Sequence, residues 1–228
     1  MDFGILTKWL IPALPALLNW VAAYAVEKAM QQRGFKPWQG GNAGRIAGIL
    51  VFLLSAALFH KAQFFNAGIF LQQQWPIDIA EWLAILVVLA ILYAWQRQLL
   101  KTRIPQGMES FPNAAMKAPR LFVYAVVFIA YLFCYEVYFR GYFLMYALRG
   151  EPLYWVIGYN SLLYALVHLH KGRQQTLAAI PFGILLCLVT LWTGHIWFAW
   201  LVHVMLELGI EVRLLSGKAI THHQKASV

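Results

Sequence analysis

The chain has 228 residues, of which 61% are hydrophobic and 12% are charged, whereas ordinary soluble domains are about 45–50% apolar and about 25% charged. This composition excludes an ordinary soluble domain and indicates that lipid is the solvent for most of the chain. The net charge of +9 comes from basic residues between apolar segments, where they anchor loops at a lipid surface, so we do not expect a nucleic-acid partner.

Hydropathy predicts seven membrane-spanning helices. In chain order they cover residues 5–26, 46–59, 77–95, 121–148, 153–168, 177–191 and 196–215. Residues 34–44 and 105–119 have the composition of loops, and residues 60–75 fit a loop, a surface helix or part of a longer span. No segment alternates apolar and polar residues as a barrel strand does. The expected fold is therefore an all-α integral membrane protein, a polytopic bundle of about seven transmembrane helices.

The basic residues are distributed unevenly between the two ends of these helices. Fourteen Lys and Arg residues fall on one side and three on the other, with Arg140 inside a span. The larger group is Lys28, Arg33, Lys36, Arg45, Arg97, Lys101, Arg103, Lys117, Arg120, Lys171, Arg173, Arg213, Lys218 and Lys225, and the smaller is Lys8, Lys61 and Arg149. The positive-inside rule then predicts an outside N-terminus and a cytoplasmic C-terminus. We expect N-terminal transmembrane helices with cytoplasmic loops over residues 1–120, a helical core over 121–215 and a polar cytoplasmic tail over 216–228.

Ionisable residues inside the predicted spans are candidates for function, because charged groups are costly in lipid. Glu136 and Arg140 are four residues apart, so they share a helix face and can pair. His168 ends the fifth predicted span, and His203 and Glu207 share a face of the seventh. Each has a structural interpretation as well: a helix-stabilising pair, an interfacial histidine or a hydrogen-bonded core pair. Since all lie on three helices of the C-terminal half, we expect them to converge.

These side chains have the chemistry of a hydrolytic site. A carboxylate, two imidazoles and a guanidinium are the groups needed to activate water and hold an anionic intermediate. His and carboxylate side chains also bind Zn²⁺, which makes Glu136, His168, His203 and Glu207 candidate metal ligands. The residues alone leave both the metal-free and the zinc alternative open.

The polar residues also follow an ordered pattern, which is Glu136-x-x-x-Arg140-Gly141, Tyr164-x-x-x-His168, Gly183 and His203-x-x-x-Glu207. Over residues 121–211 this set resembles the CAAX-protease and bacteriocin-processing (CPBP) family of intramembrane endopeptidases. The resemblance implies cleavage of a peptide or protein substrate near the membrane surface, with a CAAX-type C-terminus, a peptide leader or a membrane anchor as the target. It also implies a bacterial cytoplasmic membrane, with residues 121–215 as the catalytic-type core. His168 would activate water, His203 would hold the oxyanion, and Arg140 would organise the site through Glu136.

Three residues depart from the family pattern. Tyr135 stands where the family has its first Glu, Tyr164 replaces Phe, and Glu207 replaces Asn or Asp. Glu136 could serve as the base instead, with His203 and a protonated Glu207 on the oxyanion side, or two histidines and two carboxylates could form a metal site. A third interpretation is a catalytically inactive member that acts as a membrane scaffold or immunity protein. A small transporter is less favoured, because the chain lacks internal pseudo-symmetry.

The predicted depths of two candidate residues disagree. Glu136 lies fifteen residues after Leu121, which is about 22 Å along an untilted helix from the cytoplasmic surface. His168 is placed at the cytoplasmic end of the fifth span. The two residues can share a site only if helices tilt, break or end elsewhere.

Overall fold

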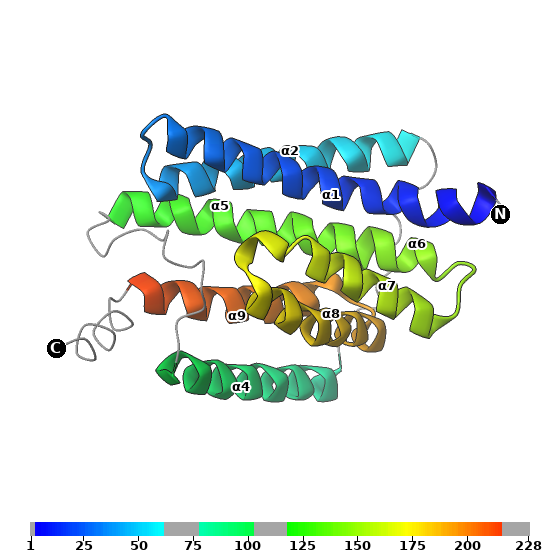
Figure 1. Cartoon of the computed structure of the whole chain (residues 1–228). Helices are drawn as coiled ribbons and strands as arrows, with labels where there is room; N and C mark the ends of the chain where they lie inside the picture. The colour runs from blue at the N-terminus through cyan, green and yellow to red at the C-terminus, as the bar shows by residue number, and fades with distance from the viewer. Residues whose placement is uncertain (1–2, 62–77, 103–117, 216–228) are drawn as a thin grey trace.

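The computed structural model describes residues 3–61, 78–102 and 118–215, and within these ranges the chain is helical with no strand (Figure 1). The helices are α1 (Phe3–Gln32), α2 (Pro37–Lys61), α4 (Ile79–Thr102), α5 (Ala118–Glu136), the π-helical η1 (Val137–Leu144), α6 (Met145–Ala147), α7 (Leu153–Leu166), the 3₁₀ turn η2 (Leu169–Lys171), α8 (Arg173–Thr193) and α9 (Ile196–Leu215). Since α5, η1 and α6 are continuous, these elements correspond to the seven predicted helices. The all-α polytopic fold is confirmed.

Four of the described helical stretches are long and apolar enough to cross a bilayer by length and composition. They are Trp9–Gln32, Trp38–Leu58, Pro119–Ala147 and Arg173–Thr193, and shorter apolar stretches cover Ile79–Trp95 and Ile196–Leu208. Helix α7 has only 14 residues, which is about 21 Å and less than the roughly 30 Å hydrocarbon core. The helix predicted for residues 153–168 is therefore present, but it is shorter than a full crossing.

The predicted loop at residues 34–44 is wrong, because α2 begins at Pro37. The turn before it contains Gly34, whose φ of 80° is readily adopted only by glycine. The glycines that suggested a loop instead pack α2 closely against α1. A Cβ on Gly44 would lie 2.6 Å from the backbone oxygen of Ala23, so this is a helix contact that only a very small residue permits. Residues 105–117 and 62–75 of the other expected loops lie outside the described residues.

The helices form a bundle in which the α1–α2 hairpin covers one side of α5 and α4 lies outermost against α9 (Figure 1). The largest buried cluster is rich in aromatic rings from α5, η1 and α7, among them Tyr135, Phe139, Phe143 and Tyr164. Many large apolar side chains, such as Leu54 and Phe122, are exposed on the outer helix faces, as expected where lipid is the solvent. The buried polar candidates Glu136, Arg140, His168 and His203 lie among these helices.

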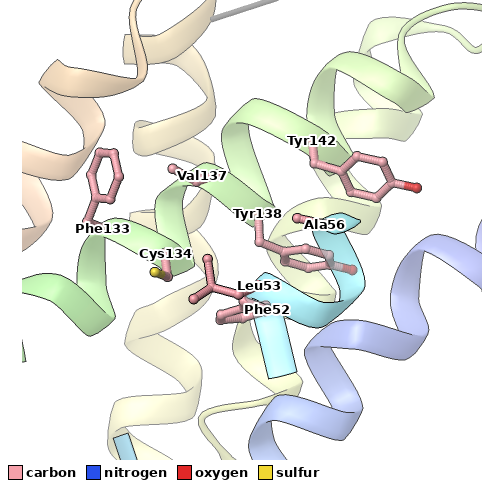
Figure 2. A pocket seen from close by; sticks show the side chains of 8 residues that line it. All are labelled: Phe52, Leu53, Ala56, Phe133, Cys134, Val137, Tyr138 and Tyr142. Atoms are coloured by element: carbon pink, nitrogen blue, oxygen red, sulfur yellow. The ribbon is translucent and has the colours of Figure 1, made fainter. Parts of the chain in front are cut away.

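An apolar cavity of about 100 Å³ lies between α2 and the α5–η1 helix (Figure 2). Its lining consists of Phe52, Leu53, Ala56, Phe133, Cys134, Val137, Tyr138 and Tyr142. None of the five candidate site residues is part of this lining. The cavity is thus separate from the polar cluster, on another face of the same helix.

Candidate functional site

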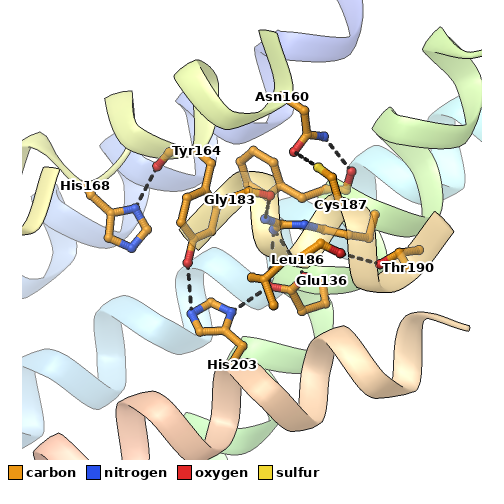
Figure 3. Close-up of polar contacts among 11 residues, drawn as sticks. Glu136, Asn160, Tyr164, His168, Gly183, Leu186, Cys187, Thr190 and His203 are labelled. Carbon is orange, nitrogen blue, oxygen red and sulfur yellow. Dashed lines mark hydrogen bonds and ion pairs between the residues drawn. The ribbon is translucent and has the colours of Figure 1, made fainter. Parts of the chain in front are cut away.

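Glu136 and His203 meet in the core, although 67 residues separate them in the sequence. The Nδ1 atom of His203 lies 2.5 Å from Oε1 of Glu136, and both side chains are buried (Figure 3). Glu136 is the last residue of α5, and His203 lies in the middle of α9. This contact brings together the Glu136-x-x-x-Arg140 and His203-x-x-x-Glu207 motifs.

Arg140 neutralises the buried carboxylate from the same helix. Its Nη1 atom lies 3.3 Å from Oε1 and 3.2 Å from Oε2 of Glu136, at 0% exposure of both side chains. Its Nη2 atom donates to the carbonyl oxygen of Gly183 at 3.3 Å, and the guanidinium lies 4.7 Å from the ring centre of Tyr164. A buried charge is tolerated when it is paired and hydrogen-bonded. Arg140 therefore holds Glu136 ionised and fixed in place.

Tyr164 connects the two histidines. Its hydroxyl group lies 3.2 Å from Nε2 of His203, and its backbone carbonyl oxygen lies 2.7 Å from Nδ1 of His168 (Figure 3). The rings of Tyr164 and His168 are 4.6 Å apart between centres. Tyr164 was identified from the sequence only as a replacement for Phe, and its hydroxyl gives it a contact that Phe lacks.

The contacts of the two Nδ1 atoms determine where the protons lie. A carbonyl oxygen only accepts hydrogen bonds, so Nδ1 of His168 carries the proton and a neutral His168 has its lone pair on Nε2. The ionised Glu136 is likewise an acceptor, so Nδ1 of His203 also donates. Within the described part of the chain, Nε2 of His168 has no hydrogen-bond partner. His168 is therefore prepared to take a proton through Nε2.

Tyr135, which stands where the resembled family has its first Glu, lies between the histidines. Its ring centre is 6.2 Å from that of His168 and 6.0 Å from that of His203. The residue is 6% exposed, and its hydroxyl has no hydrogen-bond partner among the described residues. A neutral phenol group thus occupies the position beside both imidazoles, where the family pattern has a carboxylate.

Glu207 does not join the contact between Glu136 and His203. Its Oε1 atom lies 3.5 Å from Nζ of Lys171, which belongs to the η2 turn. The pair is partly exposed, at 34% for the Lys171 side chain and 16% for that of Glu207. The structure therefore brings Glu136, Arg140, His168 and His203 to one aromatic core, with Tyr164 between the histidines, and directs Glu207 to a neighbouring ion pair.

The four candidate metal ligands do not gather around a common point. Among the described residues, no group of three or more His, Cys, Asp or Glu side chains has an arrangement that could hold a metal ion. Glu136 is already engaged by Arg140 and His203, and the nearest partner of Glu207 is an ammonium group. The donor set of the described residues therefore does not fit a zinc site.

The expected depth mismatch between Glu136 and His168 does not occur. The α6–α7 turn lies near Gly150, 14 residues after Glu136 and 18 residues before His168, so both lie about 20–27 Å from that turn along their helices. The mismatch arose because α7 was taken as a full crossing. It ends at Leu166, and His168 is therefore well inside the bundle.

Sequence reasoning missed the π-helical segment and the residue that supports it. In η1, the carbonyl oxygen of Phe139 accepts a hydrogen bond from Nδ2 of Asn160 at 2.8 Å. Asn160 is fully buried, and its Oδ1 atom accepts from Sγ of Cys187 at 3.3 Å. Wider π turns release backbone carbonyls and occur often at functional sites. The available signal was an Asn inside an apolar helix, which needs a partner wherever it is buried.

Comparison with known families gives a match that covers the site. A family model described as "Type II CAAX prenyl endopeptidase Rce1-like" matches residues 117–209. No curated protein and no solved structure matches the chain. The matched segment runs from the start of α5 into α9 and includes every residue of the buried polar cluster.

Proposed function

We propose, from the match of residues 117–209 to the family model of type II CAAX prenyl endopeptidases, that the chain is an intramembrane endopeptidase that removes the C-terminal residues of a CAAX-type substrate. The observation that carries the proposal is the pair of imidazoles on either side of Tyr164, each held through Nδ1 by an acceptor. Such a pair supplies one nitrogen that accepts a proton and a second side chain that stabilises negative charge.

His168 is the proposed general base. Its Nε2 atom takes a proton from water as the resulting hydroxide attacks the carbonyl carbon of the scissile peptide. The imidazolium then returns the proton to the leaving nitrogen, so that the C–N bond breaks and a carboxylic acid and an amine are released, between which the remaining proton is exchanged to give a carboxylate and an ammonium group. The support for this role is the fixed Nδ1–H of His168, which leaves Nε2 basic.

His203 is the proposed oxyanion partner. The carboxylate of Glu136 beside Nδ1 stabilises the protonated imidazole, whose Nε2–H donates to the oxygen of the tetrahedral intermediate, with the hydroxyl group of Tyr164 as a second donor. We assign Glu136 to hold His203 rather than to activate water, since its oxygens face His203 and Arg140. Arg140 positions Glu136, and Glu207 has no part in this step.

Cleavage of a defined peptide tests the proposal. The substrate is a fluorescent peptide that ends in S-farnesyl-cysteine followed by three residues, added to purified protein in lipid nanodiscs. Because a positioned base contributes a factor of about 10²–10⁴, we expect His168→Ala to lower kcat/KM by that amount. Glu136→Gln, which keeps the shape but removes the charge, should also lower kcat.

His170→Ala is the matched control, since His170 contacts Trp20 on α1 instead. Full activity of both site variants would refute the assigned roles.

One observation favours a second candidate, an inactive relative that acts as a membrane scaffold or immunity protein. Tyr135 fills the position of the family's first Glu, and Glu136 is paired with Arg140 and His203. If the wild-type protein cleaves no peptide while Tyr135→Glu gains cleavage, the scaffold interpretation is supported.

A further inference from the structure

The ion pair between Lys171 and Glu207 joins the η2 turn to α9. His170 directly precedes Lys171, and its Nδ1 atom accepts a hydrogen bond from Nε1 of Trp20 at 2.9 Å. Trp20 is near the middle of the apolar stretch Trp9–Gln32, about 18 Å from its end at Gln32. The turn between α7 and α8 is accordingly set back from the nearest ends of α1, α2, α5 and α9 (Figure 1). Charged groups at this depth are expensive unless water reaches them, and both members of the pair are partly exposed.

This pair is also one helical turn from each catalytic histidine. Lys171 follows His168 by three residues through the 3₁₀ turn, and Glu207 follows His203 by four residues in α9. Each step is about 6 Å along the chain. An extended peptide of three residues spans at most about 10 Å. A peptide with its scissile bond at the histidines therefore has a free C-terminus three residues later within reach of the ammonium group of Lys171.

We propose that Lys171 binds the free α-carboxylate of the substrate, and that Glu207 occupies this ammonium group when no substrate is present. The inference rests on the proposed function, because it takes the scissile bond to lie at His168 and His203. The carboxylate of Glu207 has the same chemistry as a peptide C-terminus and already lies 3.5 Å from Nζ. A substrate carboxylate replaces that of Glu207 and keeps the ammonium group of Lys171 paired with a negative charge, whereas a neutral C-terminal amide leaves it without one.

Binding of matched peptides tests the inference independently of catalysis. The probes are the S-farnesyl peptide described above with either a free C-terminal carboxylate or a C-terminal amide, and their Kd values are measured by fluorescence anisotropy in nanodiscs. We expect the free acid to bind wild-type protein at least tenfold more tightly than the amide. Lys171→Met should reduce this ratio to about one. Glu207→Gln should tighten binding of the free acid, because the competing carboxylate is lost.

Arg173→Met is the matched control, since Arg173 is an exposed cation two residues beyond Lys171 and should leave the preference intact. Equal binding of acid and amide to the wild type would overturn the inference, as would a preference that survives Lys171→Met. Loss of folding in Lys171→Met does not obscure the result, because Glu207→Gln predicts a change in the opposite direction. A clear acid preference without any cleavage would sustain the carboxylate site and reject the proposed protease.

Discussion

Two tyrosines beside the histidines differ in what their hydroxyl groups contact. The hydroxyl of Tyr164 reaches Nε2 of His203, whereas that of Tyr135 is buried without a partner among the described residues. A buried hydroxyl without a hydrogen bond costs about 1–3 kcal/mol. The two hydroxyl groups therefore contribute to stability with opposite signs, although both belong to buried aromatic rings.

Removal of each hydroxyl separates these effects. We expect Tyr135→Phe to raise the melting temperature in detergent micelles, because an unpaired polar atom is replaced by hydrogen. Tyr164→Phe should lower the melting temperature, because the loss of a hydrogen bond reduces the free energy of unfolding by about 0.5–1.5 kcal/mol. A decrease in Tyr135→Phe as large as that in Tyr164→Phe would show that the hydroxyl of Tyr135 has a stabilising partner.

At the residue scale, the sequence predicted more of the chemistry than of the contacts. Spacing alone indicated that Glu136 could pair with Arg140, and the ion pair is present. The contact of Glu136 with His203 depends on how α9 packs against α5, and helix packing is not encoded in local spacing. The pairing of Glu207 with Lys171 was missed for the same reason, since its partner lies on another element.

The irregular helix from α5 into α6 is a property of tertiary structure rather than of local sequence. Residues 137–144 have no proline, and the π turns coincide with the side-chain contact from Asn160 on α7 to Phe139. Propensity scales rank residues for regular helices and carry no information on such a contact. The length of the predicted helix was therefore nearly correct, while its internal geometry was not predicted.

Asn160 is expected to position this segment. Asn160→Leu leaves the carbonyl of Phe139 without its side-chain donor, and we expect a loss of about 1–3 kcal/mol. Asn160→Asp, with nearly the same shape, places a second acceptor against that carbonyl and should be worse. Urea or SDS titration of the purified protein measures both changes. Equal stability of the wild type and Asn160→Asp would contradict the role of the Nδ2 donor.

The α1–α2 hairpin offers a second test at the scale of elements, with two neighbouring glycines as a matched pair. A Cβ on Gly44 meets the backbone of Ala23 at 2.6 Å, whereas a Cβ on Gly41 has only the end of the Arg45 side chain at 4.0 Å. Gly44→Ala should therefore destabilise the protein by about 1–3 kcal/mol, as overpacking does. Gly41→Ala should be neutral or slightly stabilising, since Ala favours helix more than Gly. Thermal unfolding compares the two, and equal effects would rule out close packing at Gly44.

For the whole molecule, composition and hydropathy were sufficient to predict the fold class and the positions of the helices. They were insufficient for helix lengths, because α2 begins earlier than its apolar run and α7 ends short of a crossing. Gly40, Gly44 and Gly48 recur every four residues, and this spacing of small residues was the available signal for helix packing rather than a loop. Depth was mispredicted because each helix was counted as a full span.

The distribution of basic residues predicts the sidedness of the bundle. With the N-terminus outside, a cysteine introduced at Glu151, between α6 and α7, should react with a membrane-impermeant maleimide added to intact cells. A cysteine at Arg33, between α1 and α2, should react only after the cells are opened. The unsubstituted protein is the control for its own Cys134 and Cys187. The reverse labelling pattern would invert the topology and place the proposed carboxylate site on the outer side.

The spacing of Glu136 and Arg140 also bears on how the protein is made. A single ionised residue at the centre of a helix raises the free energy of insertion by about 2.5–3.5 kcal/mol. Because the two charges lie four residues apart and contact each other within one helix, they offset each other in the nascent helix when it leaves the translocon. His203 is synthesised more than sixty residues later. This buried pair thus enters the bilayer already neutralised, and insertion of the helix need not wait for the last helix of the bundle.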